Sequence, residues 1–253
     1  MLTLKKGRYK ARLAETPEDI RKAQALRYKT FIAGTGAASH GTRTAGLDQD
    51  SFDDRCAHML VEEIRTGRLV CCFRLLPIAV GSQIGNSYSA QFYELSALKA
   101  FNGPMVEMGR FCIDPQIYDP DILRVAWGAM TRYVDEKGVE MLFGCSSFKG
   151  CEATAYLDAF ALLQARHLAP KRWLPRIKAP SVFRFAQKLR RKPDLKRAMR
   201  SMPPMLRSYL AMGGWVSDHA VVDHDLNTLH VFTGLEIRSM PPRRRRLFRS
   251  LAG

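Results

Sequence analysis

The sequence has no apolar run long enough to cross a membrane, so it predicts no membrane-spanning helix. The first seven residues carry two lysines and no apolar core segment, and we therefore expect no signal peptide. Acidic residues are scarce: 24 Asp and Glu accompany 40 Lys and Arg, which gives a formal net charge of +16. This imbalance predicts an acidic partner, namely nucleic acid, an anionic membrane surface or an acidic carrier protein.

The sequence also lacks the cysteine and histidine spacing of a metal site. Its six cysteines form no CxxC pair, and no histidine lies at metal-ligand spacing. We expect no metal, and reduced thiols that pack as small apolar side chains, as is typical of a cytoplasmic protein. Apolar residues make up 46% of the 253 residues, enough for a sizeable core.

Basic residues concentrate toward the end of the chain. Residues 166–200 contain thirteen Lys or Arg and one acid, Asp194. No helix-turn-helix, zinc-finger or RNA-binding signature accompanies them, so we expect no nucleic acid partner and favour a carrier protein or anionic lipid headgroups. The tail, residues 241–253, mixes five arginines with Leu247 and Phe248. This pattern suits a contact at headgroup level, and it equally suits a disordered basic tail.

Residues 104–115 predict a strand that ends at a proline. Within this apolar run, Glu107 and Arg110 are charged. A central strand rarely carries two charges unless they pair or take part in chemistry, so a structural ion pair and a reactive site are both open here.

Residues 33–55 are rich in glycine and aspartate and are too long for a simple connection. Four carboxylates, Asp48, Asp50, Asp53 and Asp54, lie within seven positions, and their spacing does not match a calcium loop. The segment is either a solvated acidic loop or a site that recognises an amino-acid ammonium group.

Periodicity and turn residues predict the other elements. Thr16 caps a helix that starts at Pro17, with Arg27 beside its buried face as a partly buried cation that needs an acidic partner. The remaining elements are a strand at 9–14, a hairpin of strands at 56–63 and 68–76, a short helix within 79–103, a helix at 119–138, a strand at 141–145, helices at 151–163 and 203–214, and strands at 215–225 and 229–235.

Four motifs occur in a fixed order, at residues 25–31, 47–54, 67–77 and 107–111. Together they resemble the acyl-carrier-protein-dependent branch of the GNAT N-acyltransferase superfamily, over roughly residues 8–240. That branch includes the acyl-homoserine-lactone synthases and the ornithine-lipid N-acyltransferases. Two further motifs, at 144–148 and 221–228, look like the ornithine-lipid enzymes, and the lactone synthases lack the second of them.

The resemblance implies an α/β fold of the GNAT type, an α+β sandwich. A mixed central sheet is flanked by helices, and its two parallel strands splay apart to receive the pantetheine arm of the donor. We expect an acyltransferase core at 1–165. A basic helical extension with the closing strands would follow at 166–240 in the same domain, and a basic tail at 241–253.

The segment before the helix at 119–138 is informative within this family. Members that use acetyl-CoA carry a glycine-rich loop there, whose amides hold the pyrophosphate. Residues 115–121 contain no glycine and two carboxylates. We therefore expect no cofactor, and the acyl-phosphopantetheine of acyl carrier protein as the donor substrate.

The resemblance also assigns roles to residues. Glu107 would take the ammonium proton, directly or through water, and Arg110 would orient Glu107 or a loop aspartate. A backbone N–H near 110–112 would stabilise the oxyanion. The expected substrate-binding residues are Arg27, Phe31, Asp48, Asp50, Asp53, Arg74, Phe111, Ser146, Ser147, Asp223, His224 and Asp225.

Three alternatives for these residues stay open. Arg74 could pair with one of the aspartates. Cys145 could act as a nucleophile, although the sequence shows no histidine to pair with it. His224, between two carboxylates, could be a base held in one tautomer, or this motif could be a structural turn.

The resemblance thus implies an enzyme that moves a 3-hydroxyacyl chain from acyl carrier protein to the α-amino group of L-ornithine, forming a lyso-ornithine lipid. It would sit on the inner face of the cytoplasmic membrane as a peripheral protein. Glutamine, glycine and S-adenosylmethionine are alternative acceptors. A protein of another class, a non-catalytic module that binds anionic membrane or nucleic acid, is the other alternative.

Overall fold

The computed structural model describes residues 2–33 and 46–252. The Gly-rich part of the predicted 33–55 loop therefore lies outside the described residues. The chain forms two compact units: unit one comprises Met1–Pro77, Val106–Val139 and Pro242–Gly253, and unit two comprises Ile78–Met105 and Glu140–Pro241. Each unit contains strands covered by helices.

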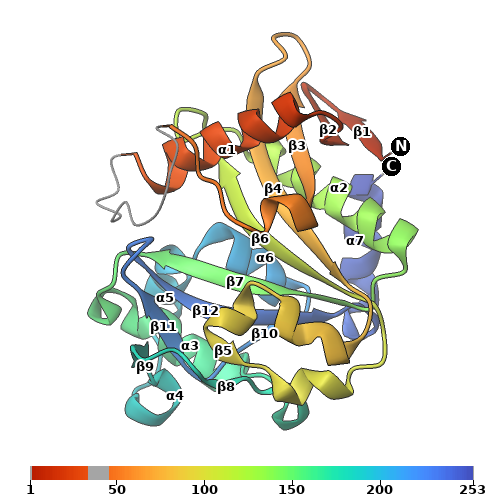
Figure 1. Ribbon diagram of the computed structural model, residues 1–253. Coiled ribbons are helices and arrows are strands. Elements are labelled where there is room, and N and C mark those ends of the chain that lie inside the picture. Colours follow the sequence, from red (N-terminus) through yellow and green to blue (C-terminus); the bar gives the residue numbers. More distant parts are fainter. Residues whose placement is uncertain (1, 34–45, 253) are drawn as a thin grey trace. The chain divides into compact units, whose positions relative to one another are not determined.

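Unit one contains an antiparallel meander of four strands (Figure 1). The strand order is β1-β2-β3-β4-β6. The hairpin of β3 and β4 was predicted from its alternating pattern and the turn at Gly67, which has a positive φ of 70°. The strands are β1 (Thr3–Lys6), β2 (Tyr9–Leu13), β3 (Ala57–Glu63), β4 (Leu69–Ile78) and β6 (Met105–Ile113).

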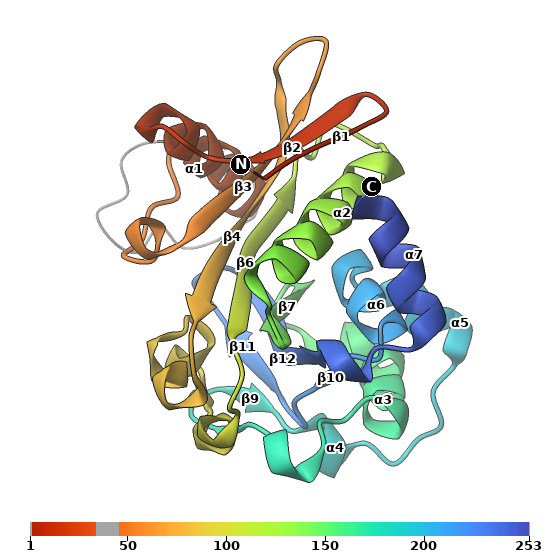
Figure 2. The ribbon, with the colours of Figure 1, turned by 90° about the vertical axis from the view of Figure 1, so that its right-hand side faces the viewer.

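Helices lie on both sides of these strands, α1 (Pro17–Phe31) on one side and α2 (Pro120–Lys137) on the other (Figure 2). The hydroxyl of Thr16 accepts a hydrogen bond from the Asp19 amide, so the predicted cap of α1 is confirmed. Asp119 caps α2, and Gly138, with a φ of 60°, ends it as predicted.

The basic tail is a helix, α7 (Pro242–Ala252), so the alternative of a disordered tail is wrong. It packs on α2, where Gly128 lets the two backbones approach. A Cβ atom at position 128 would lie 2.5 Å from the carbonyl oxygen of Leu251 and 2.7 Å from the side chain of Leu4. Arg132 of α2 donates hydrogen bonds to the carbonyl oxygens of Thr3 and Ala252, at 2.6 and 2.8 Å.

Unit two is built on a long antiparallel pair, β7 (Met141–Lys149) and β12 (Thr228–Glu236), in register from Met141 opposite Glu236 to Lys149 opposite Thr228. The order continues from β12 to β11 and β9, while β10 also pairs with β12 and β5 pairs with β8. The shorter strands are β5 (Tyr93–Glu94), β8 (Arg176–Ile177), β9 (Val182–Phe183), β10 (Trp215–Val216) and β11 (Ala220–Asp223).

The core of unit two surrounds Phe160, whose ring lies 5.0 Å from Phe148 and 5.1 Å from Phe185, centroid to centroid. The helices that contribute to this unit are α3 (Leu157–Arg166), α4 (Phe185–Lys188), α5 (Leu195–Ser201) and α6 (Pro204–Ala211). The short 3₁₀ turns of the two units are Asp53–Arg55, Gly81–Asn86, Ser89–Gln91, Ser96–Ala100, Ala153–Tyr156, Lys171–Trp173 and Ile237–Ser239.

Four predicted elements differ from the structure. The strand predicted at 215–225 is two strands, β10 and β11, separated by residues 217–219. Residues 79–103 form three 3₁₀ turns and β5 in place of one short helix, because glycine and serine interrupt the apolar positions there. Helix α3 starts at Leu157, not near 151, since turns occupy 151–156. The basic segment 166–200 contains β8 and β9 between its short helices, so it is not purely helical. The predicted domain boundaries and the splaying of the parallel strands stay predictions.

Candidate active site

Three arginines and three aspartates of unit one form one network of ion pairs. Arg27 comes from α1, Arg74 from β4 and Arg110 from β6. The aspartates, Asp48, Asp50 and Asp53, come from the acidic segment that follows residue 45. The structure therefore brings together four separate segments of the chain, and all six residues were predicted as site residues.

Arg27 is the buried centre of this network, with 1% of its side chain exposed. Its Nε donates to Asp48 Oδ2 at 2.9 Å, and its Nη1 donates to Asp53 Oδ1 at 2.7 Å. Burial alone would lower the pKa of Arg27, but its hydrogen bond to Asp53 and the two carboxylate charges raise it. The predicted acidic partner of Arg27 is thus present twice.

Arg74 and Arg110 extend the network. Arg74 donates from Nη1 to Asp53 Oδ1 at 3.0 Å and from Nη2 to Asp50 Oδ2 at 3.0 Å. Arg110 donates from Nε to Asp48 Oδ2 at 3.2 Å and from Nη2 to Asp50 Oδ2 at 3.4 Å. Each aspartate therefore bridges two arginines, and the expectations that Arg74 pairs with an aspartate and that Arg110 contacts a loop aspartate are both met.

The backbone of Arg110 is unusual. Its φ is +52°, in the left-handed region that non-glycine residues rarely adopt. A residue in this conformation interrupts the regular alternation of a strand, and such a conformation persists only where the surroundings hold it. The ion pairs of Arg110 with Asp48 and Asp50 contribute to that hold.

Two carboxylates of this network, those of Asp50 and Asp53, have lowered pKa values. Burial would raise the pKa of Asp53, but the hydrogen bonds and charges of Arg27 and Arg74 outweigh it and lower the pKa. The pKa of Asp50 is lowered in the same way, against burial, by Arg74 and Arg110. Asp50 is the most exposed of the three, with 24% of its side chain accessible, against 2% for Asp48 and 7% for Asp53.

Two polar residues that the sequence did not single out support Asp53. Gln24 donates from Nε2 to Asp53 Oδ2 at 3.1 Å, and His58 Nε2 lies 2.9 Å from the backbone oxygen of Asp53. Burial lowers the pKa of His58, so this imidazole is neutral at neutral pH. The available signal was register: His58 lies opposite Arg74 in the predicted hairpin.

Glu107, the predicted proton acceptor, is buried in β6 with 3% of its surface exposed. It lies near Cys56. Burial of the Cys56 thiol raises its pKa to about 11, and the charge of Glu107 contributes to this rise. The aromatic ring of Phe111 stacks on Phe73 with the centroids 5.5 Å apart. Phe31, at the end of α1, packs against the buried cluster of Ala23, Leu26, Leu60, Cys72 and Cys112. The roles assigned to these residues stay predictions.

In unit two, β7 presents Ser146 and Ser147 on opposite faces. The hydroxyl of Thr233 donates to Ser146 Oγ at 3.0 Å, and Ser147 is exposed. Cys145 Sγ lies 3.3 Å from Ser89 Oγ. A nucleophilic role for Cys145 stays a prediction.

The motif at 223–225 forms the turn between β11 and β12. Asp223 Oδ1 accepts a hydrogen bond from the Leu226 amide at 3.0 Å, which is the bond of an Asx turn. His224 is exposed, and within the described part of the chain its ring makes no hydrogen bond to Asp223 or Asp225. This geometry favours the structural turn over the oriented base.

A second group of titratable residues, which the sequence did not reveal, is buried in unit two. The hydroxyl of Tyr93 donates to the backbone oxygen of His230 at 2.8 Å and lies 3.1 Å from its Nδ1. The ring of His219 lies 5.2 Å from that of Tyr93, and its Nδ1 lies 2.6 Å from Asp218 Oδ1. These residues belong to three separate segments, so only the fold brings them together.

We expect His230 to make the stability of the protein pH-dependent. Burial, and then the proximity of His219, lower the pKa of His230 from 6.5 to about 3. The unfolded chain therefore binds a proton below pH 6.5 that the folded chain does not bind until about pH 3, so stability falls as the pH falls through this window. Between pH 7 and pH 5 the wild type should lose ~2 kcal/mol more than His230→Asn.

Urea unfolding at pH 7, 6 and 5 measures this difference. His224→Asn is the matched control, because His224 is an exposed histidine of the same unit. Equal pH slopes for the wild type and His230→Asn would contradict the prediction.

No group of three or more His, Cys, Asp or Glu that could hold a metal ion occurs in residues 2–33 and 46–252. The same residues include no helix with the length and apolarity that a membrane span requires.

Known proteins resemble this chain in sequence and in fold. The family model described as "Acetyltransferase (GNAT) domain" matches residues 26–128. The structure of FeeM, an N-acyl amino acid synthase from uncultured soil microbes, superposes with a TM-score of 0.53 at 13% identity, over 92% of this chain and 94% of that one. The family model and this superposition together show a GNAT-like acyltransferase fold.

The sequence relatives narrow this class. The chain is 31% identical over 249 residues to the L-ornithine N(alpha)-acyltransferase of Rhodobacter capsulatus, covering 95% of this chain and 94% of the relative. It belongs to the L-ornithine Nα-acyltransferase family. A segment of 73 residues, 29% of this chain and 34% of the relative, is also 34% identical to the acyl-homoserine-lactone synthase of Agrobacterium fabrum.

These findings confirm the predicted family and fold class. The chain has a mixed sheet flanked by helices in a GNAT-like acyltransferase fold, with a helix at its C-terminal end.

Proposed function

We propose that this enzyme transfers a 3-hydroxyacyl chain from acyl carrier protein to the α-amino group of L-ornithine and releases a lyso-ornithine lipid. The observation that carries the acceptor is the 31% identity, over 95% of the chain, to a relative named for ornithine. The proposal adds the donor and the product to that name.

The chemistry needs a neutral amine, a polarised thioester and a leaving thiolate. Glu107 is proposed to accept one proton of the ammonium group and later to release it to solvent, and its burial in β6 keeps bulk water from competing. The neutral amine nitrogen then bonds to the acyl carbon, the carbon–sulfur bond breaks, and a second proton from the nitrogen ends on the departing sulfur. The reaction needs no covalent enzyme intermediate.

The start of α2 supports a donor other than free CoA. In unit one, the carboxylate of Asp119 occupies this helix terminus, where it accepts a hydrogen bond from the Asp121 amide at 2.9 Å. Tyr9 also donates to Asp119, at 2.8 Å. A pyrophosphate bound to these amides would meet a fixed negative charge, which disfavours it. A pantetheine carried by a protein places no pyrophosphate there.

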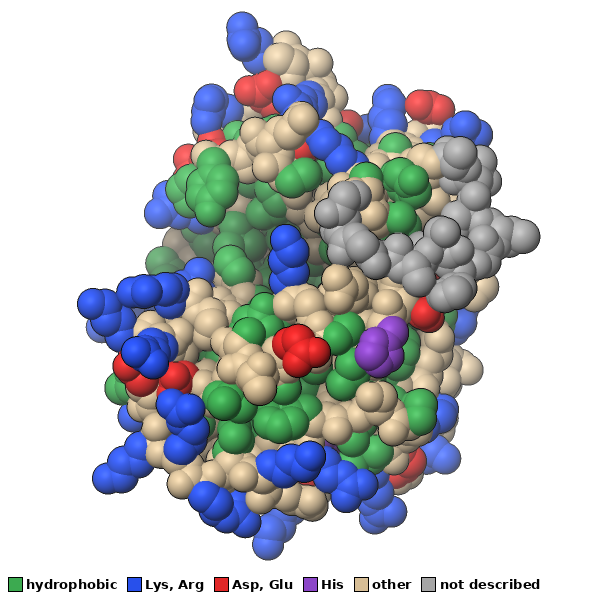
Figure 3. Space-filling model, turned by 90° about the vertical axis from the view of Figure 1, so that its left-hand side faces the viewer, with side chains coloured by type: hydrophobic (Ala, Val, Ile, Leu, Met, Phe, Trp, Pro, Cys, Tyr) green, Lys and Arg blue, Asp and Glu red, His purple; other side chains and the backbone are tan. Residues whose placement is uncertain are grey.

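The charge distribution supports an acidic carrier. Residues 166–200 of unit two hold thirteen Lys or Arg, most of them exposed. Figure 3 shows many Lys and Arg side chains along the lower edge of the face drawn, the part of the molecule that contains β8, β9 and α4 in Figure 1. A basic surface of this extent accelerates association with an acidic protein.

The direct test is incubation of the enzyme with 3-hydroxyacyl carrier protein or 3-hydroxyacyl-CoA and each of ornithine, glutamine, glycine and S-adenosylmethionine. We expect free thiol and an N-acyl product, identified by mass spectrometry, with the carrier protein and ornithine. Equal turnover with 3-hydroxyacyl-CoA would overturn the proposal that acyl carrier protein is the donor. Preference for another amine would overturn the proposal that ornithine is the acceptor. No turnover with any pair would favour a non-catalytic module.

Asp50 is the aspartate best placed to meet an ammonium group, because it is ionised and is the most exposed of the three. We expect Asp50→Asn to raise KM for ornithine about tenfold, since it removes a charge-assisted hydrogen bond, and to leave KM for the acyl donor unchanged. Steady-state kinetics with each substrate varied in turn measure this. Asp54→Asn, an exposed neighbour, is the control, and an equal rise in both KM values would contradict the prediction.

A further inference from the structure

The tail helix α7 is fixed on α2 by one of its faces. The ring of Phe248 meets that of Trp127 edge to face, with the centroids 5.6 Å apart. Arg249 pairs with Asp135 at 3.2 Å, and Ala252 is buried. These contacts recur at the helical spacing of residues 248, 249 and 252, so the opposite face of α7 points away from α2.

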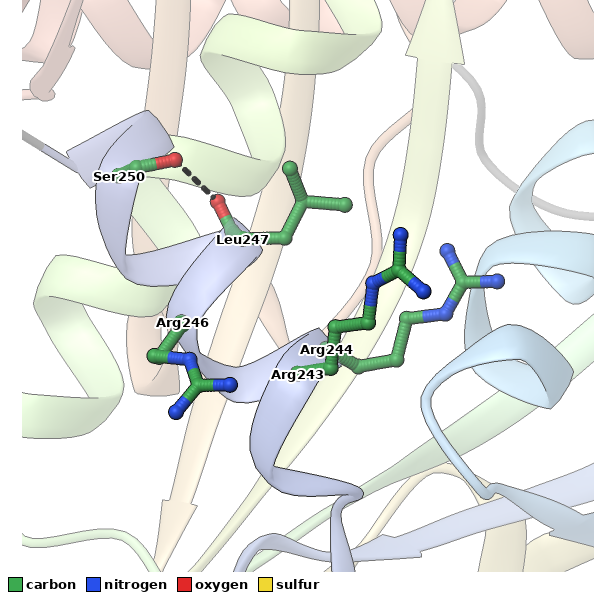
Figure 4. Close-up of a pocket in the computed structure, with 5 residues that line it drawn as sticks. All are labelled: Arg243, Arg244, Arg246, Leu247 and Ser250. Carbon is green, nitrogen blue, oxygen red and sulfur yellow. Dashed lines mark hydrogen bonds between the residues drawn. The ribbon is translucent and has the colours of Figure 1, made fainter.

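That opposite face lines a depression of about 560 Å³, made by Arg243, Arg244, Arg246, Leu247 and Ser250 (Figure 4). Figure 4 shows the guanidinium groups of Arg243 and Arg244 pointing the same way. Leu247 lies among the arginines and is 49% exposed. Within residues 2–33 and 46–252, the side chains of these three arginines make no ion pair or hydrogen bond, so their charges are uncompensated.

The position of the arginines in the helix is unfavourable for α7 itself. All three lie in the first five residues, and the first turn contains no acid. The amino end of a helix carries a partial positive charge, which cations destabilise and anions stabilise. The amino end of α7 and the guanidinium groups therefore attract the same ligand, a phosphate-type anion.

Leu247 identifies the source of that anion. A soluble phosphate gains nothing from an exposed leucine beside it, whereas a phospholipid surface offers headgroup phosphates to the arginines and an acyl boundary to the leucine. We propose that α7 docks the protein on anionic phospholipid, with Arg243, Arg244 and Arg246 on headgroup phosphates and Leu247 at the acyl boundary. This inference rests on the proposed function in one respect: the proposed product is a lipid, and docking would place its formation at a membrane.

The test is co-sedimentation of the full chain with vesicles of phosphatidylcholine alone or with 30% phosphatidylglycerol. We expect binding to the anionic vesicles only, weakened by salt. Each arginine near an anionic surface contributes about a fivefold gain in partitioning, so Arg243→Gln/Arg244→Gln/Arg246→Gln should weaken binding about 100-fold. Leu247→Ser should weaken it several-fold.

The matched control is Arg21→Gln/Lys22→Gln/Arg65→Gln, which removes the same charge from exposed positions of unit one. The affinity of this control for the vesicles should lie within about threefold of that of the wild type, because these three side chains lie outside α7. Equal losses in the two triple variants, wild-type binding by the α7 variant, or no binding by the wild type would overturn the proposal. Competition by 10 mM inorganic phosphate that abolishes binding would assign the site to free phosphate. Turnover with soluble substrates should be unchanged in the α7 variant, so a failure here is separable from a failure of the proposed acyl transfer.

Discussion

Glu107→Gln should lower the turnover of acyl transfer by about 100- to 10,000-fold, the range that positioned acid–base groups supply. Glutamine keeps the size of the side chain and one acceptor oxygen but cannot accept the ammonium proton. We expect the folded structure to persist, because the substitution removes a buried charge and leaves the volume of β6 unchanged. Single-turnover kinetics with the acyl donor and ornithine measure the loss.

The matched control is Glu136→Gln, an exposed residue of α2 in the same unit, which should retain full turnover. Raising the pH should rescue Glu107→Gln in part, since more of the amine is then neutral without a base. If the variant keeps most of its turnover at neutral pH, Glu107 is not the proton acceptor. If the wild type also forms no product, the acyl-transfer proposal itself fails.

Arg27→Met should destabilise the protein by about 3–5 kcal/mol, because it removes the more deeply buried of the two arginine partners of Asp48 and of Asp53. Methionine fills part of the volume, so the loss reflects charge more than a cavity. Urea unfolding of the full chain, followed by circular dichroism, measures it. Arg21→Met, an exposed position of the same helix, should change stability by less than about 0.5 kcal/mol.

Asp53→Asn separates pairing from simple burial. When Arg27→Met is already present, the additional loss from Asp53→Asn should be smaller than in the wild type, because the two residues act in one network. Additive losses would show that Arg27 and Asp53 stabilise the fold independently.

Local signals in the sequence predict the ends of the best-defined elements. Asp119 and Pro120 at the start of α2 and Gly138 at its end satisfy backbone groups whatever the rest of the chain does, and the same holds for Thr16 in α1. In contrast, β1 was missed. Its sequence, Thr-Leu-Lys-Lys, shows too little alternation, and it forms a strand because β2 lies beside it.

The candidate site likewise combines features that local sequence predicts with features that only the fold determines. A buried arginine demands an acid, so the partners of Arg27 and Arg74 could be expected from residue type alone. Which aspartate each one meets depends on how the segment after residue 45 returns to α1, and no local pattern encodes that path. His58, Tyr93 and His230 were missed for the same reason. A single histidine or tyrosine in a strand is not distinctive in the sequence.

The two ends of the described chain depend on each other through α2. The guanidinium of Arg132 bonds β1 with one nitrogen and α7 with the other, and Leu4 and Leu251 both close over Gly128. Removal of either end by a protease would leave one guanidinium nitrogen of Arg132 without its carbonyl partner and would expose one side of Gly128. Trimming at one end of the polypeptide should therefore loosen the other, although some 245 residues separate them along the backbone.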